Sequence, residues 1–313
     1  MLKSQLKWTD KTVVITGGGS GIGRAAAIAL TQKGATVHIV DLRQDRITAL
    51  LSELSSYPNI FGHVVDVTIP AQLEQLALQQ LASTLPRQVD ILINCAGILH
   101  QGKLATTTHQ EFRQVMDVNL WGVINSIKAF LPQLRNQRQG SHIINIASIA
   151  GLIGAPEMAA YNASKFAILG LTESLAIELA SDNIRVAAVC PGSIKTNLGQ
   201  DGLFSSDSTV AQTLRKTIHS GAAPERVALD ILQVIERSRV FKLSCVESHW
   251  RFLWLCKRLF PALYPKLSSI IYHQCIEKGW FDFLLMTKVK VRQYLRISHY
   301  GTSLQKKEKH NLT

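Results

Sequence analysis

The chain has 313 residues, of which 46% are hydrophobic and 18% charged. This length allows one large α/β domain with a sizeable core, and the composition excludes wholesale disorder. The net charge of +12 is unevenly distributed, because residues 240–313 carry about +9 of it. A basic segment can meet an anionic surface, but charge alone does not identify that surface.

The N-terminal residues and the cysteines favour a reducing compartment. No apolar run follows Met1, so we expect no signal peptide, and no stretch reaches the roughly 18 apolar residues of a spanning helix. The five cysteines form no Cys-x-x-Cys pair and no metal-ligand spacing with histidine. We therefore expect free thiols, no metal ion, and a cytoplasmic protein, with peripheral contact to a membrane surface left open.

Short β-branched runs alternate with helical stretches over the first two thirds of the chain. We expect strands at residues 12–15, 36–40, 63–65, 89–93, 142–146 and 184–189. We expect helices at residues 21–33, 69–84, 108–134, 160–179 and 224–236, the third of them ending near Pro132. Residues 197–220 are rich in Gly, Ser, Asp and Thr, which predicts a mobile loop with one short helix.

This alternation predicts a doubly wound parallel sheet of the α/β class, a Rossmann-like fold with three αβα layers. We expect one such domain over residues 1–240. A mostly helical, amphipathic and basic extension is expected over residues 241–313.

A glycine-rich loop, Thr16-Gly17-Gly18-Gly19-Ser20-Gly21-Ile22-Gly23, lies between the first strand and the first helix. Glycines here let the backbone turn tightly and approach a pyrophosphate at the helix N-terminus. The spacing differs from the commoner G-x-G-x-x-G fingerprint, but the flanking strand and helix favour a dinucleotide site over a plain turn. The candidate contacts are Gly17, Ser20, Gly21, Ile22 and Gly23.

Asp41 ends the second strand. A carboxylate in this place accepts hydrogen bonds from the adenosine ribose and repels a 2′-phosphate. Arg43 lies two residues further on and would weaken that discrimination. NAD is therefore favoured over NADP, and a plain surface aspartate is the simplest alternative.

Tyr161 and Lys165 are four residues apart and so share one helix face. Such a pair is common, but this one follows a strand that ends in Ala147-Ser148. Together with the glycine-rich loop, Asn94-Cys95-Ala96-Gly97 and Pro191-Gly192, it resembles the short-chain dehydrogenase/reductase family. The resemblance covers about residues 9–240, and residues 241–313 lie outside it.

The resemblance implies roles for four residues. Tyr161 would donate and accept the proton, Ser148 would hydrogen-bond the substrate oxygen, and Lys165 would hold the nicotinamide ribose. A free phenol has a pKa near ~10, and the Lys165 ammonium with the nicotinamide charge would lower it. Asn119 would link Lys165 to solvent through water; an amide bonded to its own helix backbone is the alternative.

Other positions match the family residue by residue. Asp66 is similar to the adenine contact, with Val67 beside it. The segment containing Asn94, Ala96 and Gly97 resembles one that supports the sheet and the adenosine side, with Cys95 where the family has a second asparagine. Pro191 and Gly192 begin a segment that matches the family's cofactor-binding one, in which the resemblance implies that the Ile194 backbone and the Thr196 hydroxyl fix the nicotinamide carboxamide.

Aromatic and basic residues are interleaved over residues 249–275. One interpretation is extra structure that packs on the core or closes the substrate cleft. A second is an amphipathic element at a membrane surface, with its cations toward anionic headgroups. A protein partner is a third. Nucleic-acid binding is not expected, because the basic residues alternate with bulky aliphatic ones.

These features predict an NAD-dependent oxidoreductase that interconverts an alcohol and a ketone or aldehyde. Residues 197–220 follow Thr196 directly and contain few charges, so we expect them to cover an apolar substrate such as a lipid, steroid, retinoid or fatty alcohol. The alternative is a dinucleotide-binding scaffold or sensor with little turnover. The resemblance further implies a homo-oligomer, a dimer or tetramer, formed through helices 108–134 and 160–179.

Overall fold

The computed structural model describes residues 7–80, 89–137, 139–204, 209–237, 239–246, 248–262, 264–266 and 268–269. The chain divides into two compact units, Met1–Leu255 and Cys256–Thr313. The first unit contains the sheet and its covering helices. Helix α10 (Ser248–Leu259) runs across the division.

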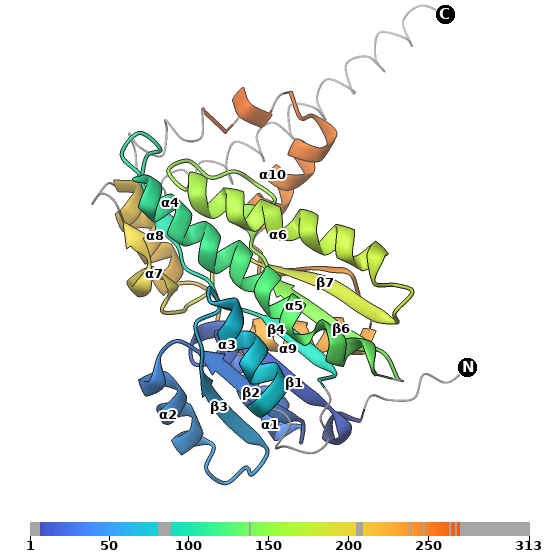
Figure 1. Cartoon of the computed structure of the whole chain (residues 1–313). Helices are drawn as coiled ribbons and strands as arrows, with labels where there is room; N and C mark the ends of the chain where they lie inside the picture. The colour runs from blue at the N-terminus through green and yellow to red at the C-terminus, as the bar shows by residue number, and fades with distance from the viewer. Residues whose placement is uncertain are drawn as a thin grey trace, which may run out of the picture. The chain divides into compact units, whose positions relative to one another are not determined.

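The first unit is built on a seven-stranded sheet with the order β3-β2-β1-β4-β6-β7-β9, and every pairing in it is parallel (Figure 1). The strands are β1 (Thr12–Thr16), β2 (Thr36–Asp41), β3 (Ile60–Val64), β4 (Ile91–Asn94), β6 (Ser141–Ile146), β7 (Ile184–Pro191) and β9 (Phe241–Ser244). The strand order reverses between β1 and β4. In such sheets the ligand crevice lies at this reversal, beyond the carboxyl ends of the strands.

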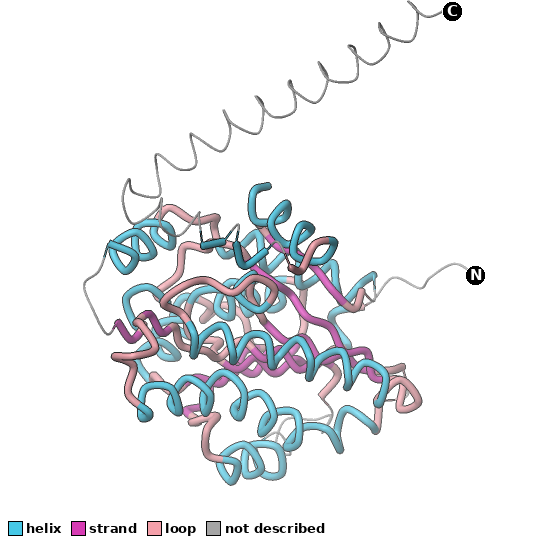
Figure 2. The backbone as a smooth tube through the Cα atoms, turned by 90° about the horizontal axis from the view of Figure 1, so that it is seen from above, coloured by secondary structure: helices cyan, strands magenta, loops and turns pink. Residues whose placement is uncertain are grey.

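Helices cover both faces of the sheet, so the predicted three-layer fold is confirmed (Figure 2). In β1, the side chains of Val13 and Ile15 join one core cluster and that of Val14 joins the other. Successive residues of a strand point to opposite faces, so a strand buried on both faces is apolar throughout. The helices are α1 (Gly21–Gln32), α2 (Gln44–Glu53), α3 (Pro70–Gln75), α4 (His109–Met116), α5 (Gly122–Arg135), α6 (Ala159–Glu178) and α9 (Pro224–Arg237).

The sheet continues past Val240, so the domain boundary expected there is too early. Strand β9 pairs with β7 from Ala188–Phe241 to Pro191–Ser244. Helix α9 packs on α1 and leads into β9, which completes a further crossover unit. The strand is short and contains Lys242 and Ser244, so no β-branched run marks it in the sequence.

The helix expected over residues 108–134 is wrong in two details. A π-helical turn, η4 (Asp117–Trp121), separates α4 from α5. Helix α5 also continues through Pro132 to Arg135. Proline removes one backbone hydrogen bond, but Phe130 and Leu134 on either side are fully buried and keep the helix in place.

Residues 197–220 contain more regular structure than the loop expected from their composition. They form α7 (Leu198–Asp201), β8 (Leu203–Phe204) and α8 (Thr209–His219). Strand β8 pairs with β5 (His100–Gln101). Helix α8 buries Ala211 and Ile218, whose spacing places them on one face. Packing therefore overrides the turn-forming composition.

The expected C-terminal extension is described only in part. Helix α10 is observed, and residues 270–313 lie outside the described residues, so most of the predicted tail is untested. Within the part of the chain that is described, no helix has both the length and the apolar character needed to cross a membrane.

Candidate active site

Three of the predicted catalytic side chains meet at the carboxyl end of β6 and the start of α6. Ser148 follows β6 and caps the turn η5 (Ile149–Gly151), where its Oγ accepts a hydrogen bond from Ala150 N at 3.1 Å. A hydrogen bond also joins the side chains of Ser148 and Tyr161. Lys165 lies one turn further along α6, with its Nζ 5.7 Å from the centre of the Tyr161 ring.

Burial controls the protonation of this pair. Tyr161 and Lys165 are each only 6% exposed. Burial raises the pKa of Tyr161 to about 12, against the opposing effect of the Ser148 hydrogen bond. Burial also lowers the pKa of Lys165 to about 8, and its Nζ donates to the carbonyl of Ile146 at 2.9 Å. Burial therefore raises the pKa of Tyr161, and the lowering expected from Lys165 together with the nicotinamide charge stays a prediction.

Asn119 lies in the π-helical turn η4 and is completely buried. Its Oδ1 accepts from Ile98 N at 2.8 Å, and its Nδ2 donates to Ile98 O and Ser164 Oγ, both at 3.0 Å. The amide therefore joins the loop after β4 to α6, rather than bonding its own helix. π-Helical turns are frequent at functional sites.

Gly97 marks where this network meets Lys165. A Cβ atom on Gly97 would lie 3.2 Å from Asn119 Oδ1 and 3.6 Å from Lys165 Nζ. Asn119 and Lys165 thus converge on the same loop. The water between them stays a prediction.

The glycine-rich loop is held by backbone contacts. Gly17 has a φ of +66°, and a Cβ there would lie 2.7 Å from the backbone of Ala96. A Cβ on Gly23 would lie 2.2 Å from the carbonyl oxygen of Gly17. Only glycine fits at either position, and the loop is pressed between the start of α1 and the residues after β4. Ser20 is the N-cap of α1, and Gly21 and Ile22 are its first residues. The backbone N–H groups of a helix N-terminus can bind an anion.

Asp41 is buried at the end of β2 and is oriented by two backbone donors. Its Oδ2 accepts from Gly19 N at 2.9 Å and its Oδ1 from Arg43 N at 3.0 Å. The carboxylate therefore joins β2 to the glycine-rich loop. The guanidinium of Arg43 makes two hydrogen bonds of 2.8 Å to Asp45, so its charge is neutralised by a neighbour.

Two of the predicted cofactor residues act inside the fold. Asn94 is buried, and its Nδ2 donates to Asn145 Oδ1 at 2.9 Å. Asn145 in turn donates to Thr172 Oγ1 at 2.9 Å. Asn94 thus supports the sheet, and the side chain of Val67 is buried in the core. Their predicted contacts with the cofactor stay predictions.

The sequence reasoning missed Asn145 and Thr172. A signal for Asn145 was present, because it is a polar residue between the apolar residues Ile144 and Ile146 of a buried strand.

At the end of β3, Asp66 accepts two hydrogen bonds from Thr68, from its N at 2.9 Å and its Oγ1 at 2.7 Å. This fixes the turn that follows β3. Its predicted contact with adenine stays a prediction.

The segment after β7 returns to the glycine-rich loop. Pro191 ends β7, and Gly192 N donates to Ser244 O at 2.9 Å. Ile194 is buried. A Cβ on Gly21 would lie 3.0 Å from the methyl carbon of Thr196. The structure therefore brings Thr196 next to the loop.

Two thiols lie close enough to Lys165 to interact with it electrostatically. Burial raises the pKa of Cys95 and of Cys190 to about 12, and the Lys165 charge opposes both shifts. Both thiols are therefore protonated at neutral pH. Nothing in the sequence indicated that Cys190 belongs to this site. Among the described residues, no group of three His, Cys, Asp or Glu side chains is placed to hold a metal ion.

Tyr161 also belongs to an apolar cluster that includes residues 197–220. The buried members are Leu99, Ala150, Met158, Tyr161 and Ile218, with Ala155, Leu198, Phe204 and Leu214 packed against them. The Tyr161 ring is therefore packed among apolar side chains.

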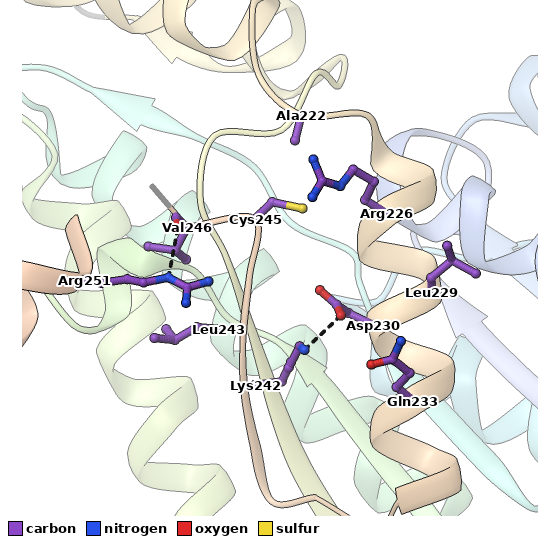
Figure 3. A pocket seen from close by; sticks show the side chains of 10 residues that line it. All are labelled: Ala222, Arg226, Leu229, Asp230, Gln233, Lys242, Leu243, Cys245, Val246 and Arg251. Atoms are coloured by element: carbon purple, nitrogen blue, oxygen red, sulfur yellow. Dashed lines mark hydrogen bonds and ion pairs between the residues drawn. The ribbon is translucent and has the colours of Figure 1, made fainter. Parts of the chain in front are cut away.

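A separate surface cavity of about 610 Å³ lies between α9, β9 and the start of α10 (Figure 3). Asp230 and Lys242 face each other across it, 3.0 Å apart. None of its lining residues is one of the predicted site residues.

Comparisons with known proteins agree with this geometry. The short chain dehydrogenase family model matches residues 11–203. Dehydrogenase/reductase SDR family member 6 of Rattus norvegicus is 35% identical over 198 residues, which cover 63% of this chain and 76% of the relative. The 3-oxoacyl-(acyl-carrier-protein) reductase FabG of Thermotoga maritima is 36% identical over 192 residues, covering 61% of this chain and 77% of the relative.

A solved structure extends the likeness. It is a short chain dehydrogenase/reductase from Burkholderia phymatum in complex with NAD, with a TM-score of 0.72 and 26% identity, covering 87% of this chain and 96% of that one. Because 87% of the chain is more than 240 residues, the similarity to this structure extends beyond Val240. We expected the resemblance to the family to end at that residue. On the family match, the relatives and this fold, the chain belongs to the short-chain dehydrogenase/reductase family of oxidoreductases.

Proposed function

We propose that this protein is an NAD-dependent dehydrogenase or reductase that interconverts an apolar alcohol and its ketone or aldehyde. The observation that carries the proposal is the arrangement around Tyr161. Its side chain is hydrogen-bonded to Ser148, lies beside Lys165 and packs in an apolar cluster.

The residues around the glycine-rich loop fit a dinucleotide. The loop has no side chain at Gly17 or Gly23, where a Cβ would meet backbone, and it ends at the N-terminus of α1. Such a loop can approach a pyrophosphate closely. The bound dinucleotide supplies or accepts the hydride, and its oxidised ring adds a positive charge.

The chain's own residues handle the substrate oxygen and the proton. Ser148 donates a hydrogen bond to that oxygen and stabilises the charge that develops on it. Tyr161 takes the alcohol proton at its phenolic oxygen, or returns it in the reduction. The buried Lys165 ammonium favours the phenolate, and a second positive charge nearby would favour it further.

Asp41 supports NAD as the cofactor rather than NADP. Its two oxygens are held by Gly19 N and Arg43 N, which places a fixed negative charge beside the glycine-rich loop. The one cation two residues away, Arg43, is paired with Asp45. A 2′-phosphate would therefore meet the negative charge of Asp41.

An apolar substrate is supported by the cluster around Tyr161. Leu198, Phe204, Leu214 and Ile218 all come from residues 197–220 and pack on the phenol side of the site. A lipid, steroid, retinoid or fatty alcohol would replace these contacts with similar ones.

The test compares Tyr161→Phe with wild type on a panel of alcohols graded in size and polarity. We expect turnover to fall by at least about a thousandfold while NADH binding, followed by its fluorescence, is unchanged. Tyr57→Phe is a matched control, because Tyr57 packs against the core cluster that contains Val13 and Ile15 and not against the cluster around Tyr161. Wild-type rates in Tyr161→Phe would refute the mechanism. Wild-type NADH binding with no turnover on any alcohol would favour a scaffold or sensor instead.

We also propose that α10 lies against an anionic membrane surface, which makes the protein a peripheral one. Phe252, Leu255 and Leu259 are 55%, 49% and 61% exposed, and their spacing places them on one stripe of the helix. Arg251 and Arg258 are exposed beside that stripe. An apolar stripe flanked by cations suits the headgroup region.

Flotation with phosphatidylglycerol vesicles tests this contact. The double variant Phe252→Ser/Leu255→Ser should lose most of its binding, and phosphatidylcholine vesicles should bind wild type weakly. Leu229→Ser, on α9 and 56% exposed, is the matched control. Removal of residues after Val240 is a poor test, because it deletes β9. Equal flotation of all variants would count against the proposal.

A homo-oligomer is supported by apolar side chains on the outer surface of α6 and η4. Ile177, Trp121 and Phe166 are 81%, 53% and 37% exposed. Ile177→Lys should shift the mass measured by light scattering toward the monomer. A monomeric wild type would refute the assembly.

A further inference from the structure

Arg46 lies in the first turns of α2 and reaches over the glycine-rich loop. Its Nη1 is 3.4 Å from Ser20 Oγ. A Cβ on Gly19 would lie 2.9 Å from the Cβ of Arg46. The Cβ of Arg46 therefore covers Gly19, and the guanidinium lies next to Ser20, the N-cap residue of α1.

The other side of the same guanidinium is bound to α7. Nη2 of Arg46 is 2.6 Å from Asp201 Oδ2, a contact between residues 155 positions apart. Helix α7 begins two residues after Thr196 and leads into β8, which pairs with β5. The ion pair thus joins the helix that follows Asp41 to the segment that packs around Tyr161.

This pair differs from its neighbour Arg43–Asp45, which is local and fully exposed. Arg46 and Asp201 are 20% and 42% exposed, so the arginine is the more enclosed partner. The planar guanidinium can donate two parallel hydrogen bonds to the oxygens of either a carboxylate or a phosphate. An anion at the N-terminus of α1 would lie beside Ser20 and therefore within reach of Arg46.

We propose that Arg46 binds a phosphate group of the dinucleotide, and that Asp201 holds its guanidinium when the site is empty. This rests on the proposed function, since it assumes a dinucleotide at the loop. Because the ion pair is partly exposed, exchanging a carboxylate for a phosphate costs little. Cofactor binding then releases α7, so occupancy of the loop is coupled to the segment over the substrate side.

The test is fluorescence titration with NADH and with NADPH, which needs no turnover. Arg46→Ala should weaken NADH binding by about tenfold or more, because a charge-assisted contact is lost. Asp201→Asn should tighten it by up to about fivefold, because the competing carboxylate is gone. In the double variant the Asp201 change should have no effect.

A matched control is the pair Arg135–Asp182, an exposed Arg–Asp contact of 2.7 Å that joins the end of α5 to the turn before β7. Arg135→Ala and Asp182→Asn should leave both titrations unchanged. Thermal melts confirm that each variant is folded.

The two cofactors identify the phosphate. Weaker binding of both NADH and NADPH in Arg46→Ala assigns the contact to the pyrophosphate, and weaker binding of NADPH alone assigns it to the 2′-phosphate. Unchanged binding of both would overturn the inference, as would weaker binding in Asp201→Asn. A wild-type protein that binds neither would overturn the proposed function as well.

Discussion

The glycine-rich loop and the segment that covers Tyr161 lie on two sides of the same site, but they are held in place differently. Around the loop, Gly17 and Gly23 approach backbone atoms so closely that a Cβ at either would collide with them. Around Tyr161, the contacts are between apolar side chains such as Leu214 and Ile218. Backbone contacts of this kind allow almost no substitution, whereas apolar packing accepts side chains of similar volume. The cofactor side is thus fixed, and the substrate side is free to change its specificity.

The largest expected effect is on the fixed side. Gly17→Ala places a Cβ 2.7 Å from the backbone of Ala96 at a φ of +66°. We expect NADH affinity to fall at least about a hundredfold and the free energy of unfolding to fall by about 2–4 kcal/mol. Titration and urea unfolding measure the two quantities.

Gly154→Ala is the control for this change, because a Cβ there meets nothing within 4 Å. Normal NADH binding in Gly17→Ala would break the comparison, because the loop would then tolerate a side chain.

Acid should destabilise the strand that carries Asp41. His38 on β2 is fully buried beside His63, with Nδ1 and Nε2 of the two rings 3.0 Å apart, and burial lowers its pKa from 6.5 to about 4. The unfolded chain takes up this proton near pH 6.5, whereas the folded chain resists it to about pH 4. The free energy of unfolding should therefore fall as the pH drops through this window, by up to about 3 kcal/mol.

Urea unfolding at pH 7 and pH 5 measures this slope. His142 on β6 adds to it, since burial lowers its pKa to about 4 as well. His38→Phe, which keeps a ring next to Phe61, should reduce the slope. An identical slope in wild type and His38→Phe would exclude His38 as its source.

A substitution on the substrate side should change the KM for the substrate more than it changes cofactor binding. Ile218→Ala removes apolar contact around Tyr161, at a cost of about 2 kcal/mol in stability. We expect the KM for an apolar alcohol to rise about tenfold, with the NADH affinity unchanged.

Ile231→Ala on α9 is the matched control. It should also lower the free energy of unfolding, but Ile231 lies in the core cluster that contains Val13 and Ile15 and not in the cluster around Tyr161. If Ile218→Ala altered NADH binding and left KM unchanged, Ile218 would act on the cofactor side and the comparison would fail.

The smallest effect is expected at a residue outside both the glycine-rich loop and the apolar cluster around Tyr161. Thr108 accepts from Glu111 N at 3.1 Å, and Glu111 bonds back to Thr108 N, which forms a capping box at the start of α4. Thr108→Ala should lower the free energy of unfolding by about 1 kcal/mol. Cofactor affinity and KM should both stay at wild-type values. A change in either would show that α4 contributes to the site.

The glycine-rich loop, Asp41 and the Tyr161–Lys165 pair could be located from the sequence because their constraints are local. The glycine spacing, Asp41 at a strand end and the Tyr161–Lys165 pair each lie within a few residues of an element boundary. Prediction from the sequence failed where distant packing decides the structure. Helix α8 buries Ile218 in a cluster with Leu99 and Met158, which are far away in the sequence. Strand β9 is a strand only because β7 lies beside it.

The pKa of Tyr161 was also not predictable from the sequence. Lys165 and the nicotinamide charge together are expected to lower the phenol pKa, but the sequence carries no information about burial. In the folded protein, desolvation raises the Tyr161 pKa to about 12. The extra positive charge of an oxidised nicotinamide is then required to reverse the shift.

That reversal can be measured. The absorbance difference between wild type and Tyr161→Phe, followed with pH at the phenolate band, reports the titration of Tyr161 alone. We expect a pKa of about 12 in the free protein and a clearly lower one with saturating NAD⁺, because the added charge favours the phenolate. The same pKa with and without NAD⁺ would contradict the role of Tyr161 as the proton acceptor.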